Sequence, residues 1–285
     1  MNLKDSPLIS IITPAFNAAA SIELALRSVI DQEYKNIEHI VVDGLSQDKT
    51  AEIITKYAHQ WKHIRMIRDS DRGVYDAMNK GIEESNGDFL CFLGSDDQFY
   101  DKWVLTDLVK SGLLSEERVV YGNVKIEGDT GWAKDGQIYD GRFTKRKLVS
   151  QNICHQAIFY PKSLLSKINL YNIDYKINAD WDLNWRCWIK SEFLYFDRII
   201  CNFRAGGTST NTIDFAFRRD YMPNIQRYFG YSAKKTLEIG SHSPWGDLTL
   251  DPDNPAISKY PPLETLIRIL IDKIKNLKRK WKIIF

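Results

Sequence analysis

The first hundred residues alternate between short apolar runs and stretches in which apolar residues recur every three or four positions. The runs are rich in β-branched residues, which is typical of buried strands, and the wider spacing is typical of amphipathic helices. Such alternation predicts an α/β domain with a mainly parallel sheet and helices on both faces. The predicted strands are 8–13, 37–42, 64–67 and 89–93, and the predicted helices are 22–30, 54–61 and 74–85.

The second half of the chain has a weaker pattern. It predicts a strand over 119–126, a polar hairpin or loop over 128–143 and a helix over 180–190. Five of the nine prolines fall within 240–262, which predicts a linker. We therefore expect one domain over 1–239, a linker over 240–262 and a separate segment over 263–285.

The segment 263–285 predicts a basic amphipathic helix. Its apolar residues alternate four and three positions apart, and residues 265–285 hold seven Lys or Arg side chains against one Asp. We favour a helix that lies on an anionic membrane surface, with Trp281 and Phe285 near its end. A coiled-coil seam, which would make a homodimer, and docking onto the preceding domain stay open. Because the remainder of the chain is mildly acidic, we expect no binding to nucleic acid.

Composition narrows the class of protein further. The chain has 285 residues, of which 44% are hydrophobic and 27% charged, as in a globular protein with a real core. Its four cysteines form no CxxC pair, which argues against a zinc framework or a disulfide scaffold and favours a reducing compartment. Neither a secretory signal nor a run of about 20 apolar residues is present, so we expect a cytoplasmic protein, peripheral at the inner face of the membrane if the tail binds there.

Carboxylates follow the ends of the predicted strands. Asp43, Asp71, Asp96 and Asp97 all lie just past a strand, where parallel sheets bind their ligands. The adjacent Asp96 and Asp97 would repel each other unless a cation lay beside them, and Mg²⁺ or Mn²⁺ commonly bridges carboxylates and phosphates. The alternative is that Asp96 caps a helix.

Four motifs occur in order at these strand ends: Ile12–Asn17 (ITPAFN), Asp43–Thr50 (DGLSQDKT), Asp71–Gly81 (DRGVYDAMNKG) and Gly94–Asp97 (GSDD). Together they resemble the N-terminal half of family-two glycosyltransferases, which are inverting, nucleotide-sugar-dependent enzymes with the GT-A fold. The resemblance covers residues 8–97 and continues more loosely to about 210. It implies a nucleotide-binding half over 1–97 and an acceptor half over 98–239.

The resemblance also implies roles for single residues. Asp43 would bind the base, usually uracil, Asp96 the ribose, and Asp97 a divalent metal, Mn²⁺ or Mg²⁺. The other expected nucleotide-binding residues are Thr13, Pro14, Asn17, Asp71 and Arg72. Tyr75, Ala77 and Met78 are interpreted as helix packing, and Ser46 and Thr50 as turn and cap residues.

A second segment, Asn178–Arg186 (NADWDLNWR), resembles the acidic stretch near the acceptor site of this family. Asp180 aligns with the catalytic base, although Ala179 replaces the frequent Glu. Asp182 is expected to pair with Arg186, and the tryptophans of this segment to join the core. Residues His155 and Gln156 are expected near the donor sugar and acceptor, and Arg204, Gly207 and Ser209 in a loop over the diphosphate.

We therefore expect an inverting, metal-dependent hexosyl- or N-acetylhexosaminyl-transferase. Its donor would be a UDP-sugar and its acceptor a saccharide or lipid-linked saccharide in polysaccharide biosynthesis. The alternative is a non-catalytic sugar-nucleotide-binding scaffold at the membrane. A sugar-1-phosphate nucleotidyltransferase is disfavoured because no basic Gly-rich loop follows the first strand, and a dehydrogenase because no GxGxxG opens the first helix.

Overall fold

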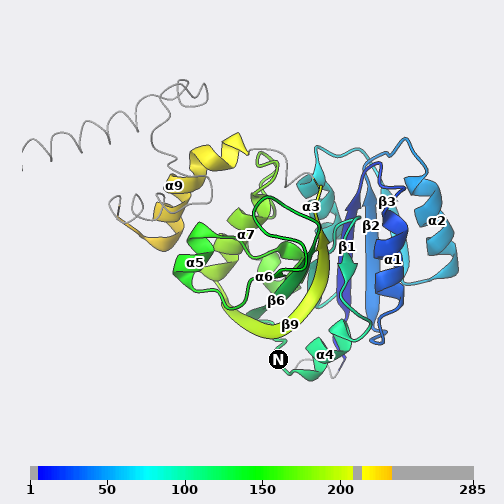
Figure 1. Cartoon of the computed structure of the whole chain (residues 1–285), viewed down its shortest axis with the longest axis horizontal. Helices are drawn as coiled ribbons and strands as arrows, with labels where there is room; N and C mark the ends of the chain where they lie inside the picture. Colours follow the sequence, from blue (N-terminus) through cyan, green and yellow to red (C-terminus); the bar gives the residue numbers. More distant parts are fainter. Residues whose placement is uncertain (1–5, 208–213, 233–285) are drawn as a thin grey trace, which may run out of the picture. The chain divides into compact units, whose positions relative to one another are not determined.

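The computed structural model describes residues 6–207 and 214–232 (Figure 1). The chain divides into two compact units, residues 1–217 and 218–285, and every strand given below belongs to the first. The predicted linker 240–262 and the predicted basic helix 263–285 lie outside the described residues. Within the described ranges, no helix is both long and apolar enough to cross a bilayer.

A single sheet of nine strands forms the centre of the first unit, and its N-terminal part is parallel, as predicted. Strands β3, β2, β1 and β4 are parallel neighbours in that order, and the antiparallel β8 then joins β4 to β6. Strand β6 pairs in parallel with β9, whereas β5 and β7 pair antiparallel with β9 and β6. The strands are β1 (Ile9–Ala15), β2 (Ile37–Asp43), β3 (Ile64–Arg68), β4 (Phe89–Phe92), β5 (Gln98–Phe99), β6 (Arg118–Glu127), β7 (Ile138–Tyr139), β8 (Ile158–Pro161) and β9 (Glu192–Arg204).

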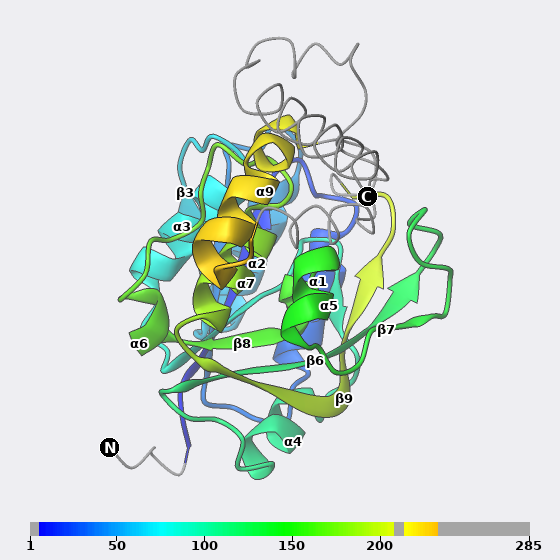
Figure 2. The same cartoon turned by 90° about the vertical axis from the view of Figure 1, so that its left-hand side faces the viewer.

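Helices cover both faces of the parallel part, with α1 and α2 on one face and α3 on the other (Figure 1). The second half places α5 and α7 near β6 and β9 (Figure 2). Strand β7 returns antiparallel to β6, so the hairpin or loop expected over 128–143 is a hairpin. The helices are α1 (Ile22–Ile30), α2 (Thr50–Gln60), α3 (Val74–Glu84), α4 (Val104–Lys110), α5 (Lys145–Ser150), α6 (Lys162–Leu165), α7 (Ala179–Trp188) and α9 (Phe215–Phe229), with a 3₁₀ turn η1 at His155–Ala157.

Burial explains why the N-terminal pattern was easy to interpret. All seven residues of β1 are buried, as expected for a strand between two parallel neighbours with helices on both faces. Helix α1 buries its apolar stripe of Ile22, Ala25, Leu26 and Val29 completely. In both β1 and α1, the positions of the apolar residues in the sequence therefore indicate which surface is buried.

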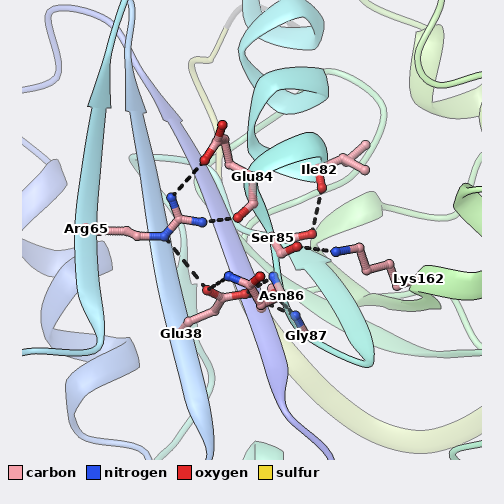
Figure 3. Close-up of polar contacts among 9 residues, drawn as sticks. Glu38, Arg65, Ile82, Glu84, Ser85, Asn86, Gly87 and Lys162 are labelled. Carbon is pink, nitrogen blue, oxygen red and sulfur yellow. Dashed lines mark hydrogen bonds and ion pairs between the residues drawn. The ribbon is translucent and has the colours of Figure 1, made fainter.

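A polar network fastens the amino ends of the parallel strands, at the edge opposite the strand-end carboxylates (Figure 3). Glu38 on β2 accepts hydrogen bonds from the Ser10 hydroxyl at 2.6 Å and from the backbone N–H groups of Asn86 and Gly87. Arg65 on β3 lies 3.8 Å from the same carboxylate. These bonds hold the pKa of Glu38 below its usual value although burial raises it. The turn between α3 and β4 is thereby tied to three strands.

Candidate active site

Strand register brings the first polar cluster together at the carboxyl ends of β1, β2 and β3. Asp43 pairs with Ala15 of β1 and with Arg68 of β3 in one row of the sheet. Its Oδ2 accepts a hydrogen bond from the Ser46 N–H at 3.2 Å and lies 3.2 Å from Nε of Arg68. Its Oδ1 is buried and has no hydrogen-bond partner among the described residues. A buried carboxylate oxygen without a partner is costly, so this atom is poised to accept a hydrogen bond from a ligand.

Arg68 was not among the expected site residues. The signal was present in the sequence, because an Arg that ends the strand next to the one ending at Asp43 falls beside that carboxylate in a parallel register. The guanidinium also donates to the Ser46 carbonyl at 3.2 Å. Arg68 therefore fixes both the Asp43 side chain and the turn after β2, which confirms the interpretation of Ser46 as a turn residue.

The expected residues Asp71 and Arg72 lie in the loop after β3. A Cβ at Gly44 would clash with the Asp71 carboxylate, so Asp71 lies directly against the turn that follows Asp43. Asp71 Oδ1 accepts from the Gly73 N–H at 2.9 Å. The Arg72 guanidinium is largely exposed and lies 3.6 Å from Asp76. Asp71 thus lies beside the turn that follows Asp43, whereas the Arg72 side chain of the same loop is exposed to solvent.

The C-terminal part of β1 contributes packing, and the residues after it form a tight turn. Thr13 and Pro14 are buried within β1, and the Thr13 hydroxyl lies 2.9 Å from Nε2 of His39. Asn17 adopts a left-handed conformation with φ of 49°, and its Oδ1 accepts from the Gln47 N–H at 2.9 Å. This bond ties the turn after β1 to the turn after β2. The contacts of these three residues with a nucleotide stay predictions.

Asp96 and Asp97 form the second cluster, after β4. They lie in a turn that leads into β5 rather than at a helix start, so the alternative of Asp96 as a helix cap is wrong. Asp97 is 2% exposed and accepts hydrogen bonds from Gln156 Nε2 and from the Arg204 N–H, both at 2.9 Å. Burial and the neighbouring Asp96 carboxylate raise the pKa of Asp97 to about 7, and burial also raises the pKa of Asp96.

Glycines leave room for these two carboxylates to converge. A Cβ at Gly94 would lie 2.5 Å from Asp97 Oδ2 and 3.0 Å from Asp96 Oδ1, so both oxygens face the same small space. A Cβ at Gly207 would lie 3.5 Å from Asp96 Oδ2, which places the loop after β9 next to this turn. Two converging carboxylates with raised pKa values, one buried and one partly buried, fit a divalent cation, which would offset their repulsion. Because no group of three or more His, Cys, Asp or Glu side chains within 6–207 and 214–232 is arranged to hold a metal, such an ion would need further ligands from a substrate.

Asp180 forms the third cluster, in the first turn of α7. It is 7% exposed, and three side chains surround its carboxylate. Asn152 Nδ2 donates to Oδ2 at 2.8 Å, His155 Nδ1 lies 3.1 Å from Oδ2, and the Tyr75 hydroxyl lies 3.0 Å from Oδ1. The Tyr75 hydroxyl also donates to the Ile177 carbonyl. Burial and the Asp180 charge raise the pKa of Tyr75 well above its usual value, so the phenol stays neutral.

Tyr75 and Asn152 therefore have a role beyond the one expected from the sequence. Tyr75 was interpreted as helix packing, and it is buried as that interpretation requires, but it also touches the expected base. Its partner lies 105 residues away, so no local pattern could have indicated the contact. Asn152 stands just before the His155–Gln156 pair, and that proximity was the only sequence signal for it.

The η1 turn links the second and third clusters. Its consecutive residues His155 and Gln156 contact Asp180 and Asp97, respectively. Cys154, which precedes them, is partly buried, and desolvation together with the Asp180 and Asp97 carboxylates raises the pKa of its thiol well above the usual value. The short η1 turn thus contacts two different acidic groups, Asp97, which lies beside Asp96, and Asp180, which is surrounded by hydrogen-bond donors.

Two other expectations for this region are confirmed, namely the Asp182–Arg186 pair and the burial of Trp181 and Trp185, whereas the roles of Arg204, Gly207 and Ser209 stay predictions. Asp182 lies 2.8 Å from Nε of Arg186, and Trp181 and Trp185 are buried, with both indole N–H groups donating to the Leu148 carbonyl. Ser209 lies outside the described residues. The Arg204 backbone reaches Asp97, as described above, and the Arg204 charge lowers the pKa of Asp96 against the effect of burial.

Comparison with known proteins identifies the family. Residues 10–168 match the family described as glycosyl transferase family 2. A PGL/p-HBAD biosynthesis glycosyltransferase of Mycobacterium tuberculosis (strain H37Rv) is 36% identical over 213 residues, which cover 73% of this chain and 81% of the relative. A second glycosyltransferase of that strain, named only as uncharacterized, is 29% identical over 244 residues, with coverage of 82% and 89%.

Solved structures show the same fold. S. aureus TarS matches with a TM-score of 0.63 and 17% identity, over 90% of this chain and 76% of that one. The mannosyltransferase PcManGT of Pyrobaculum calidifontis matches with a TM-score of 0.55 and 16% identity, over 96% and 83% of the two chains. The chain belongs to glycosyl transferase family 2 and has the GT-A fold.

Proposed function

We propose that this protein is an inverting, metal-dependent glycosyltransferase that moves a sugar from a UDP-sugar to a hydroxyl group of a saccharide or lipid-linked saccharide. The observation that carries the proposal is that the two consecutive residues His155 and Gln156 of η1 contact two different acidic sites. One is the converging carboxylate pair of Asp96 and Asp97, and the other is the hydrogen-bonded Asp180. The first suits a cation and a diphosphate, and the second suits an acceptor hydroxyl.

Asp180 is the general base of this proposal. Its donors orient the carboxylate while leaving lone pairs on both oxygens to accept the proton of an acceptor hydroxyl. As that proton moves to Asp180, the acceptor oxygen forms a bond to the anomeric carbon, and the bond from that carbon to the phosphate oxygen breaks on the opposite face. An α-linked donor then gives a β-linked product through an oxocarbenium-like transition state.

The Asp43 carboxylate at the end of β2 suits a nucleotide whose base carries a ring N–H. Asp43 Oδ1 is a buried acceptor without a partner among the described residues, and Arg68 holds the carboxylate so that this oxygen remains free. The imide N–H of uracil matches such an acceptor. TarS has been solved in complex with UDP-GlcNAc and UDP, and PcManGT with GDP-Man and Mn²⁺, which supports a nucleotide-sugar donor without deciding between bases.

Asp97 and Asp96 would hold the divalent metal, which when bound supplies positive charge to the leaving nucleoside diphosphate. The chain's own contribution is to orient Asp97 through Gln156 and the Arg204 N–H. Arg204, which ends β9, and Gly207, which lies just after it, would close over the diphosphate. His155 lies between the two clusters and would contact the donor sugar or the acceptor.

Two further features support the acceptor class and the cellular location. One group of relatives is named for PGL/p-HBAD biosynthesis, which supports a role in the biosynthesis of a glycosylated product. The sequence of 263–285 supports a peripheral membrane contact on the cytoplasmic side, where an enzyme of this kind would meet such an acceptor. A homodimer through the same segment stays an alternative prediction.

Two measurements test the proposal. The first is thermal stabilisation by UDP, GDP, CMP and dTDP, each with Mn²⁺ and with EDTA, and we expect a Mn²⁺-dependent increase in Tm with UDP. The second uses Asp180→Asn, which should retain that stabilisation and lose at least about 100-fold in transfer, within the range that general-base catalysis contributes. Asp182→Asn is the matched control, since Asp182 pairs with Arg186 on the same helix. Near-normal turnover by Asp180→Asn would contradict the assignment of the base, and unchanged Tm with every nucleotide would contradict the donor class.

A further inference from the structure

The loop between β6 and β7 exposes a tryptophan beside the site. Trp132 is 44% exposed, although indole is the largest apolar side chain and usually buries most of its surface. The loop lies next to the C-terminal end of β9 (Figure 2), where the Ala205 N–H donates to the Glu127 carbonyl. This Trp differs from a scattered apolar side chain, because the strand end beside its loop includes Arg204, whose N–H binds Asp97.

The backbone around Trp132 is firmly held. The Thr130 hydroxyl, which is buried, accepts from the Ala133 N–H at 2.8 Å and from the Trp132 N–H at 3.3 Å. The Thr130 N–H in turn donates to the Ala133 carbonyl at 3.1 Å. Ala133 packs into the main hydrophobic cluster of the first unit. The turn is therefore anchored from inside, and it presents the indole outward at little further cost in conformational entropy.

The Trp132 indole packs against two aromatic rings. The Trp132 ring centroid lies 4.9 Å from that of Tyr139 and 5.7 Å from that of Phe203. Both distances are typical of aromatic packing, so these rings cover part of the indole, while 44% of the residue's surface remains exposed. A Trp that served only to cover Tyr139 and Phe203 would not need to leave almost half of its surface in solvent.

The same two rings connect Trp132 to both acidic clusters. The Tyr139 hydroxyl donates to the Asn152 carbonyl at 2.8 Å, and the Asn152 side chain donates to Asp180. Phe203 directly precedes Arg204, whose N–H binds Asp97. Burial is the main cause of the raised pKa of Tyr139, and the Asp180 charge adds to it. Trp132 therefore packs on two side chains that adjoin the residues binding Asp180 and Asp97.

We propose that Trp132 is the platform on which a pyranose ring of the acceptor stacks, so that the acceptor is itself a saccharide rather than a bare lipid or phenol. This inference rests on the proposed function, because it concerns the substrate that Asp180 deprotonates. The apolar C–H face of a pyranose packs on an indole, and the outward hydroxyl groups then remain free for polar contacts. Among possible sugars we assign the acceptor's, because Trp132 reaches the site through Tyr139 and Asn152, on the Asp180 side.

The test uses saturation-transfer NMR on the full chain with UDP, Mg²⁺ and a panel of methyl pyranosides of glucose, galactose, mannose, rhamnose and N-acetylglucosamine. We expect transfer to at least one glycoside, a decrease of at least fivefold in Trp132→Ala, and partial recovery in Trp132→Phe. Trp132→Leu keeps an apolar cover over Tyr139 and Phe203 without an aromatic face, so it separates stacking from a loss of folding. Trp103→Ala is the matched control, since Trp103 is 46% exposed and lies at the start of α4.

The outcomes are distinct. Equal transfer to Trp132→Ala, Trp132→Leu and Trp103→Ala, or no transfer to any glycoside in the unmodified protein, overturns the inference. So does a loss of UDP-GlcNAc affinity relative to UDP in Trp132→Ala, measured by calorimetry, because the ring would then bind the donor sugar. If UDP binding persists in these experiments, only the inference fails. If the unmodified protein binds none of UDP, GDP, CMP and dTDP, the proposed function fails instead.

Discussion

The Tyr75 hydroxyl offers a sharp test of how Asp180 is held. Replacing Tyr75 by Phe removes one oxygen atom and leaves the ring stacked on Tyr171, whose centroid lies 5.2 Å away. The lost contacts are the 3.0 Å approach to Asp180 Oδ1 and the hydrogen bond to the Ile177 carbonyl. A hydrogen bond to a charged group contributes about 1.5–3 kcal/mol, and a hydroxyl shared between two acceptors falls at the low end.

We therefore expect Tyr75→Phe to lower kcat by about tenfold, which corresponds to about 1.4 kcal/mol. The free energy of unfolding should fall by about 1 kcal/mol because the Ile177 carbonyl loses its partner. Binding of UDP with Mn²⁺ should not change, since Tyr75 contacts neither Asp43 nor Asp97. The assay is release of UDP in the presence of acceptor, combined with urea unfolding of the same preparation.

Tyr171→Phe is the matched control. The Tyr171 hydroxyl is buried and has no hydrogen-bond partner among the described residues, although its ring stacks on that of Tyr75. Removing an unsatisfied buried hydroxyl should leave kcat within twofold and should keep or raise stability. If Tyr75→Phe had the same kcat as Tyr171→Phe, the hydroxyl would not position the base, and the contact at 3.0 Å would be incidental packing.

Three further predictions concern stability and the carboxylate pair. Glu38→Gln should destabilise the fold by about 1–3 kcal/mol, because it removes the charge that four donors surround, and urea unfolding would show it. Burial, aided by His63, lowers the pKa of His39 from 6.5 to about 3, so the unfolded chain binds more protons than the folded chain below pH 6.5 and stability falls as the pH drops. Between pH 7.5 and 5.5, the free energy of unfolding of His39→Gln should therefore decrease by about 1.4 kcal/mol less than that of the unmodified protein. An equal decrease in both proteins would contradict this. Gly94→Ala should abolish Mn²⁺-dependent stabilisation by UDP, since its Cβ would occupy the space between Asp97 Oδ2 and Asp96 Oδ1, and retained stabilisation would show that no cation binds there.

The N-terminal half could be predicted from the sequence because its signals are local. The strands of the parallel part are short runs rich in Ile and Val, and the helices show their buried stripes, so the boundaries of α1 and β3 were correct to within one residue. Strand β8 has only four residues, and its antiparallel place between β4 and β6 depends on contacts far apart in the chain. The thirteen-residue β9 likewise has no clear alternation, because both ends of it pair with β6 across a register shift.

The site shows the same division between local and distant signals. Acidic residues at strand ends were found because topology places the ends of parallel strands at one edge. The side chains that orient them were not, since Asp180 receives Asn152 from 28 residues away and Tyr75 from 105. Arg68 is the intermediate case, because register alone brings it to Asp43, and a stricter use of the predicted sheet would have found it.

The two edges of the parallel sheet differ in how completely their polar groups are satisfied. At the amino edge, Glu38 accepts from several donors, and the network of Figure 3 ties strands and turn together. At the carboxyl edge, Asp43 Oδ1 is buried without a partner among the described residues, and burial together with the neighbouring Asp96 carboxylate raises the pKa of Asp97 to about 7. Each of these arrangements costs stability in the absence of a ligand. A nucleotide that donates to Asp43 and a cation between the carboxylates would remove both penalties at once, so ligand binding should stabilise this edge specifically, and the protein tolerates the cost because the opposite edge holds the same strands in place.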